Sequence, residues 1–226
     1  VKYRYMKIIP TNIEPKTAEY IINHTASDDD YLKKIINEME KNGIRKINIT
    51  PFEGNIISTI LSAIKPKRGV EIGTLCGYSS LWISKSLDEN GKLYTIEKEP
   101  KHAEIALKMI SELGLEKKII VMNSEAKEAL SKLSKFSPFD FCFIDANKED
   151  YPYYIKWALK NLRSGGLIIA HNPLMKGNLF YEGEDKQQNA KSRGMREFLH
   201  ILFTDDKISQ RAIIPTSDGI AVGLVK

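Results

Sequence analysis

Apolar residues recur at helical spacing through the first third of the chain, between residues 14 and 63. One such stretch carries Leu32, Ile35, Ile36 and Met39, the positions of a single helix face. Residues 27–30 (Ser-Asp-Asp-Asp) precede it as a cap with an acidic first turn, and Gly43 ends it. The aspartates could suggest a metal cluster, but a solvated helix start explains them. The pattern predicts an N-terminal helical segment.

From about residue 67 the pattern changes to short apolar strands that alternate with helices. We predict strands over residues 69–72, 92–96, 118–122, 139–144 and 166–170. We predict helices over residues 79–87, 101–113, 125–133, 151–162 and 195–203. Such alternation indicates an α/β fold with a parallel sheet and helices on both faces. Two last runs, 208–214 and 219–225, are joined by a short link at 216–218 and predict a C-terminal antiparallel hairpin, which makes the sheet seven-stranded and mostly parallel.

Length and composition indicate one globular domain. The 226 residues are 42% hydrophobic and 28% charged, so we expect a single domain over 1–226, with a helical segment at 1–65 and the α/β core at 66–226. No apolar run approaches the ~18 residues of a membrane span, and none near the N-terminus suits a signal peptide. Cys76 and Cys142 lack metal-ligand spacing. We therefore expect a cytoplasmic protein with reduced thiols.

The net charge of +5 arises from 34 basic and 29 acidic residues. It could indicate an anionic partner such as RNA or a coenzyme A thioester. Both signs are spread along the chain, however, as on the Lys/Glu-rich surface of a heat-adapted protein. We favour this second interpretation.

A turn with two glycines follows the first predicted strand. The run Glu71-Ile72-Gly73-Thr74-Leu75-Cys76-Gly77 leaves that strand and enters a helix. Gly73 permits the turn and the approach of a ligand to the backbone, and Gly77 lets the helix pack closely. Glu97 ends the second strand, where a carboxylate can accept hydrogen bonds from both ribose hydroxyls. The spacing predicts a ribose-bearing cofactor at the carboxyl ends of the strands.

A nicotinamide cofactor is the main alternative. Its fingerprint, GxGxxG, has a middle glycine that this run lacks. Glu71 would repel a pyrophosphate, whereas an acid there suits the positive α-amino and sulfonium groups of S-adenosylmethionine. Glu71 could instead pair with a lysine at the strand end.

Four segments resemble the caffeoyl-CoA and catechol O-methyltransferase family: VEIGTLCGYS at 70–79, TIE at 95–97, FDFCFIDANK at 139–148 and GGLI at 165–168. The resemblance runs from about residue 51 to the C-terminus. It implies the Rossmann-like fold of class I methyltransferases and S-adenosylmethionine as cofactor. By this resemblance, the cofactor-binding residues are Ile49, Glu71, Gly73, Thr74, Ser79, Glu97, Glu125, Ala126 and Asp145.

The resemblance also implies a divalent metal at the ends of the fourth and fifth strands. In the family two aspartates and an asparagine hold magnesium, which grips both oxygens of a vicinal diol. Here Asp145 and Asn172 match, but His171 stands at the second aspartate. A histidine ligand favours manganese, iron, nickel or zinc over magnesium. His171 could equally be a non-ligand that caps the strand end.

Lys148 and Asp145 are the predicted catalytic residues. Lys148 resembles the general base of the family, since a cation nearby favours the neutral amine. It could instead be a solvated lysine in the first turn of a helix that Asn147 caps.

These residues predict a metal-assisted O-methyltransferase for a small catechol-like or other hydroxylated acceptor. One alternative acceptor is tRNA carrying 5-hydroxyuridine, which the basic-aromatic residues 2–7 and the basic run at 65–68 would permit. Another alternative is a non-catalytic cofactor-binding protein whose His171 has abolished metal binding.

We expect residues 173–192 to form a lid over the acceptor. From the resemblance alone, we expect the protein to form a homodimer. We expect no association with a membrane.

Overall fold

The computed structural model describes residues 14–25, 30–216 and 218–226. Three helices come first: α1 (Pro15–Thr25), α2 (Asp30–Lys41) and α3 (Pro51–Ser62). The cap predicted at residues 27–29 lies outside the described residues, as does the basic-aromatic start at 2–7. A capping box begins α3, because the Thr50 hydroxyl accepts from the N–H of Glu53 and the Glu53 carboxylate accepts from the N–H of Thr50.

The sheet has seven strands in the order β3-β2-β1-β4-β5-β7-β6. Their bounds are β1 (Arg68–Ile72), β2 (Lys92–Glu97), β3 (Ile119–Asn123), β4 (Phe139–Ile144), β5 (Leu162–His171), β6 (Ile208–Ile214) and β7 (Ile220–Val225). All neighbours among β1 to β5 pair in parallel, whereas β7 pairs antiparallel with β5 and with β6. The predicted mostly parallel sheet with a C-terminal hairpin is confirmed.

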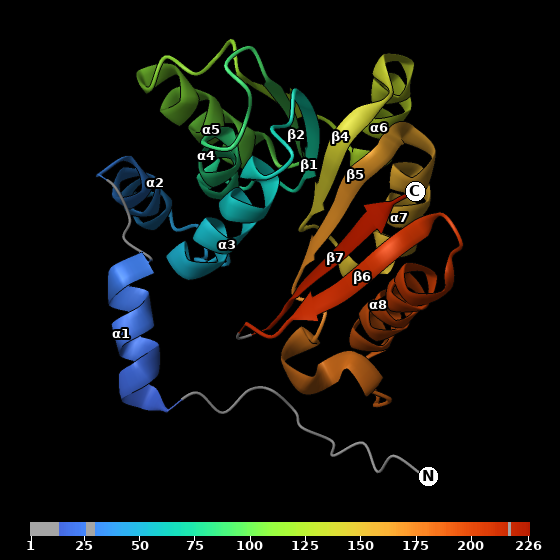
Figure 1. Ribbon diagram of the computed structural model, residues 1–226. Coiled ribbons are helices and arrows are strands. Elements are labelled where there is room, and N and C mark those ends of the chain that lie inside the picture. The colour runs from blue at the N-terminus through green and yellow to red at the C-terminus, as the bar shows by residue number, and fades with distance from the viewer. Residues whose placement is uncertain (1–13, 26–29, 217) are drawn as a thin grey trace, which may run out of the picture.

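Helices cover both faces of this sheet (Figure 1). The remaining helices are α4 (Tyr78–Ser84), α5 (Pro100–Glu112), α6 (Ala126–Leu133), α7 (Tyr151–Asn161) and α8 (Lys186–Thr204). Three short 3₁₀ turns join them: η1 (Ser134–Phe136), η2 (Lys148–Asp150) and η3 (Met175–Phe180). None of the described helices is long and apolar enough to cross a membrane.

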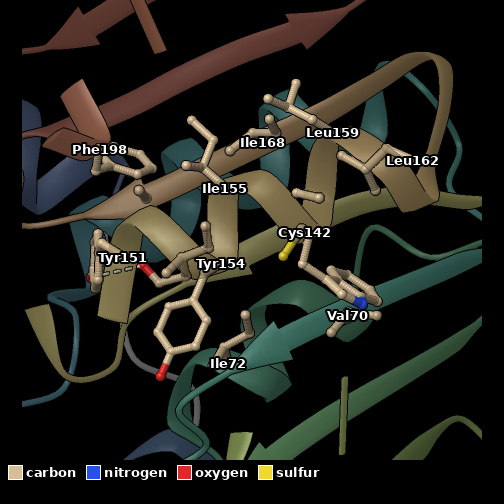
Figure 2. Close-up of a cluster of buried hydrophobic side chains, with 14 of the residues drawn as sticks. Val70, Ile72, Cys142, Tyr151, Tyr154, Ile155, Leu159, Leu162, Ile168 and Phe198 are labelled. Carbon is tan, nitrogen blue, oxygen red and sulfur yellow. Dashed lines mark hydrogen bonds between the residues drawn. The ribbon is translucent and has the colours of Figure 1, made fainter. Parts of the chain in front are cut away.

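Alternate residues of the central strands face two hydrophobic cores. Phe141 and Phe143 point to the core shared with α2 to α5, whereas Cys142 and Ile144 point to the core shared with α6 to α8. Figure 2 shows the second core, in which Tyr151 of α7 meets Phe198 of α8 with ring centroids 5.4 Å apart. Burial on both faces explains why these strands read as continuous apolar runs.

Two elements begin several residues before their predicted starts. Strand β5 begins at Leu162 rather than at 166, with a register shift against β4. Helix α8 begins at Lys186, nine residues before the predicted start, inside the predicted lid at 173–192. The side chain of Asp185 caps it by accepting from the N–H groups of Gln187 and Gln188. The first turns of α8 are polar, so hydrophobic spacing did not mark them.

Candidate functional site

A cavity of about 450 Å³ opens at the carboxyl ends of the central strands. It lies where the chain order reverses between β1 and β4, which is where open α/β sheets bind ligands. The predicted site residues in its wall are Ile49, Gly73, Thr74, Ser79, Glu97, Glu125, Ala126, Asp145, Lys148 and Asn172. No residue of 173–192 lines it, and the role of this segment as a lid over the acceptor stays a prediction.

The loop from β1 to α4 brings backbone against the cavity. Gly73 has φ +99°, and a Cβ there would lie 2.1 Å from the carbonyl oxygen of Asp145. Only glycine fits this position, because both the conformation and the space exclude a side chain. Gly77 has φ +89° at the start of α4. The two glycines thus leave a backbone-lined floor on which a cofactor can lie.

Glu97, at the end of β2, presents a carboxylate that the backbone has already oriented. Its Oε2 accepts from the N–H of Leu75 at 2.8 Å, and its Oε1 accepts from the N–H of Glu99 at 2.9 Å. His102 Nδ1 lies 3.8 Å from the same Oε1. The remaining lone pairs of the carboxylate can accept ribose hydroxyls.

Glu71 is fully buried and does not line the cavity. Its two carboxylate oxygens accept hydrogen bonds from the hydroxyls of Ser79 and Ser80. Burial raises the pKa of Glu71 to about 7, against the opposing effect of these serine hydroxyls. Ser79 does line the cavity. Glu71 therefore acts on the cavity through Ser79, and its direct contact with a cofactor stays a prediction.

Lys148 lines the part of the cavity that is next to the carboxyl ends of β4 and β5. Its Nζ donates to Asp145 Oδ1 at 3.1 Å, to the Tyr151 hydroxyl and to the carbonyl of His171 at 3.3 Å. Gly194 of α8 packs against this turn so closely that a Cβ would lie 2.4 Å from the carbonyl oxygen of Lys148. Backbone packing therefore holds the Lys148 turn, and Asp145 holds its side chain.

His171 lies behind Asp145, only 3% exposed, between two carboxylates. Its Nδ1 is 3.0 Å from Asp145 Oδ2, and its Nε2 is 3.3 Å from Glu53 Oε2. The second contact is an ion pair without an aligned hydrogen bond. Burial alone would lower the pKa of His171, but Asp145 and Glu53 raise it to about 9.

The two carboxyl groups respond in the opposite sense. Burial alone would raise the pKa of Asp145, but Lys148 and His171 lower it to about 2. Burial would likewise raise the pKa of Glu53, but His171 and the N–H of Thr50 lower it to about 2. The site therefore holds two carboxylates, one against each nitrogen of a single ring.

This donor set does not fit the metal centre that the resemblance implies. Asp145 and Asn172 line the cavity, whereas His171 turns both nitrogens toward carboxylates and does not line it. A ring nitrogen must lose its proton before it can coordinate a metal ion. No group of three or more His, Cys, Asp or Glu in the described part of the chain is arranged to hold an ion.

Sequence reasoning missed several residues of the site. Glu53 and Thr216 complete the surroundings of His171, and Thr216 donates to Glu53 Oε1 at 2.8 Å. His102 and Tyr154 line the cavity. The capping-box spacing of Thr50 and Glu53 was a readable signal for the orientation of Glu53. No local pattern could indicate its contact with His171.

Comparisons with known proteins agree with this geometry. A family model described as O-methyltransferase matches residues 22–226. The catechol O-methyltransferase of Niastella koreensis is 32% identical over 213 residues, which cover 92% of this chain and 95% of that protein. The O-methyltransferase of Bacillus cereus, solved in complex with S-adenosylhomocysteine, superposes with a TM-score of 0.84 at 27% identity, covering 92% of this chain and 96% of that one. The enzyme of tomaymycin synthesis from Streptomyces achromogenes, solved with S-adenosylmethionine, gives a TM-score of 0.83 at 27% identity, covering 93% and 96%.

Proposed function

This chain belongs to the O-methyltransferase family and is an S-adenosylmethionine-dependent enzyme of its catechol and caffeoyl-CoA-like class; we propose that it methylates a hydroxyl of a small catechol-like or other hydroxylated acceptor. The observation that carries the proposal is that Lys148 and the glycine-loop floor line the same cavity. A hydroxyl next to Lys148 can therefore approach a methyl group held over that floor.

On the cofactor side, we assign the floor at Gly73 and Thr74, with Ser79, to the methionine part. We assign Glu97 to the ribose, and the cavity wall at residues 125–126, together with Ile49, to closing over the adenine side. When bound, S-adenosylmethionine supplies an electrophilic methyl group on its sulfonium. The residues of this chain then have to orient the acceptor oxygen, exclude water and remove a proton.

On the acceptor side, we assign proton removal to Lys148. Nζ of Lys148 lies within hydrogen-bond distance of Asp145, Tyr151 and the His171 carbonyl. As general base, Lys148 takes the proton of the acceptor hydroxyl on its amine lone pair. The Asp145 carboxylate stabilises the ammonium ion that results.

A small acceptor is favoured over tRNA by the position of the basic run. Residues 65–68 precede or begin β1, so they lie at the amino ends of the strands, whereas the cavity opens at the carboxyl ends. The Arg68 guanidinium donates a hydrogen bond to the carbonyl of Phe136 at 2.8 Å, so this basic group is engaged in a contact within the chain.

The test is methyl transfer from labelled S-adenosylmethionine to a panel of catechols and monohydroxy phenols, with bulk tRNA as a separate arm. We expect labelled product from the small aromatic acceptors. Methylation of tRNA alone would overturn the acceptor assignment. Cofactor binding with no transfer to either acceptor class would support a non-catalytic binding protein instead.

A further inference from the structure

We propose that the row Glu53–His171–Asp145 takes the place of a divalent cation at this edge of the sheet, so that the enzyme transfers methyl groups without a bound metal. The inference rests on the proposed function for its catalytic part. Its structural part, that these residues hold no divalent cation, is independent of any acceptor.

The first argument is the occupation of the ring. His171 presents both nitrogens to carboxylate oxygens, Nδ1 to Asp145 at 3.0 Å and Nε2 to Glu53 at 3.3 Å. Each contact is favourable when the nitrogen carries a hydrogen and unfavourable when it presents a bare lone pair. A metal ion would need that lone pair and would have to break one of the two contacts.

The second argument is the occupation of the carboxylates. The other oxygen of Asp145 accepts from Lys148 at 3.1 Å. Glu53 Oε1 accepts from Thr216 at 2.8 Å, and Oε2 accepts from the N–H and the hydroxyl of Thr50, both at 2.9 Å. All four carboxylate oxygens thus have partners within the chain. An entering cation would have to displace these partners as well as lose its own water.

The third argument is the charge balance. Two carboxylates, Glu53 and Asp145, lie against the basic side chains of His171 and Lys148. These side chains already occupy the positions around the carboxylates that a cation would take. A divalent cation would add two positive charges in a largely buried place, where uncompensated charge is costly.

The row therefore makes His171 a positioning residue, which holds Asp145 and through it Lys148. It also changes what an acceptor must offer. A metal ion grips two adjacent oxygens of a diol, whereas Lys148 can engage a single hydroxyl. We therefore infer that the acceptors include aromatic molecules with one hydroxyl as well as catechols.

The first experiment measures metal and activity on the same purified protein. After treatment with a chelator, we expect substoichiometric metal by mass spectrometry and an unchanged methylation rate with both a catechol and its monohydroxy counterpart. Magnesium, manganese, nickel and zinc should leave the melting temperature unchanged. One tightly bound metal per chain, or activity lost on chelation and restored by a metal, would overturn the proposal while leaving the methyltransferase function intact. Absence of transfer to any acceptor, with no metal bound, would refute the proposed function and leave the structural part standing.

The second experiment restores a carboxylate. His171→Asp removes the ring cation and adds a negative charge beside Asp145, so we expect metal addition to raise its melting temperature. The exposed His200 provides the matched control, because His200→Asp makes the same change on the surface of α8. A metal response of the native protein equal to that of His171→Asp would contradict the proposal. If His171→Asp does not fold, Glu53→Gln serves instead: it removes the charge that faces Nε2, and a stoichiometric metal bound by native protein and lost in this variant would also contradict the proposal.

Discussion

The backbone N–H of Leu75 donates a hydrogen bond to Oε2 of Glu97 at 2.8 Å. Leu75 has φ +50°, a left-handed conformation that is unfavourable for a leucine. The carboxylate at the end of β2 therefore stabilises the strained loop that forms the cavity floor. One side chain both shapes the floor and faces the space where the ribose is expected, so the two halves of the cofactor site are linked.

Replacing Glu97 with alanine should weaken S-adenosylmethionine binding about 10²–10⁴-fold, because hydrogen bonds to both ribose hydroxyls are lost. Each hydrogen bond to a charged acceptor contributes roughly 1.5–3 kcal/mol, and the loop at Leu75 loses its anchor at the same time. Titration calorimetry measures the affinity. Glu104→Ala, which removes an exposed carboxylate of the neighbouring helix α5, should bind as the native protein does. Equal affinity of the Glu97 variant would mean that the ribose lies elsewhere.

Lys148→Ala should lower turnover about 10²–10⁴-fold and leave cofactor affinity nearly unchanged. Lys148→Arg separates the role of a base from the role of a charge, because arginine keeps the cation but does not deprotonate in proteins. We expect the arginine variant to be as slow as the alanine variant. Initial rates at saturating cofactor measure this, with Lys132→Ala, which replaces an exposed residue of α6, as control. High activity of Lys148→Arg would show electrostatic stabilisation instead of proton removal.

Glu71→Gln should stabilise the protein at neutral and higher pH. Burial raises the pKa of Glu71 from 4.5 to about 7, so the folded state keeps a proton that the unfolded chain has lost. The stability gained from this proton is present below pH 4.5 and disappears as the pH rises to about 7. The advantage of the glutamine variant should thus grow from near zero to as much as about 3 kcal/mol. Urea unfolding from pH 4.5 to 8 measures the difference. A difference that does not change with pH would contradict the prediction.

A homodimer is a further expectation, and helix α1 offers a surface to test it. None of its residues is buried, and Tyr20 and Ile22 are 65% and 47% exposed. If α1 packs against a second copy, the double variant Tyr20→Ser/Ile22→Ser should shift the protein from dimer to monomer. Light scattering after size exclusion measures the mass. Leu107→Ser, which replaces an exposed residue of α5, should not change it. A native protein that is monomeric at micromolar concentration would refute the expectation.

The fold was readable from the sequence wherever burial produced an unbroken apolar run. The bounds predicted at 139–144 match the buried strand β4 residue for residue. The bounds predicted at 208–214 match β6 as well, although this strand carries Ser209, Gln210 and Arg211 and is mostly not buried. The start of β5 was missed because it contains Arg163, Ser164 and two glycines rather than apolar residues. The first turns of α8 were missed because the helix depends there on a cap at Asp185 and on contacts of Ser192, which donates to the carbonyl of Asn178. Hydrophobic periodicity does not report such polar contacts.

The site was readable only as far as local motifs reach. Gly73 and Glu97 follow from a turn and a strand end, and both line the cavity. The environment of His171 did not follow, because its partner Glu53 comes from a helix before the sheet begins. The type of a residue suggests what it can bind, but its neighbours decide whether its nitrogen is free to do so. For that reason the sequence left open whether the histidine at this ligand position of the family is a ligand.

The contact between Glu53 and His171 makes the helices before the sheet part of the catalytic edge. A fragment that began at residue 66 would contain every strand, the glycine loop and Lys148. It would nevertheless lack Ile49 in the cavity wall and the carboxylate that faces Nε2 of His171. The core is therefore not a self-sufficient module to which a helical extension was added. If this core were joined to another N-terminal segment, that segment would have to place a carboxylate against Nε2 of His171, as Glu53 does here.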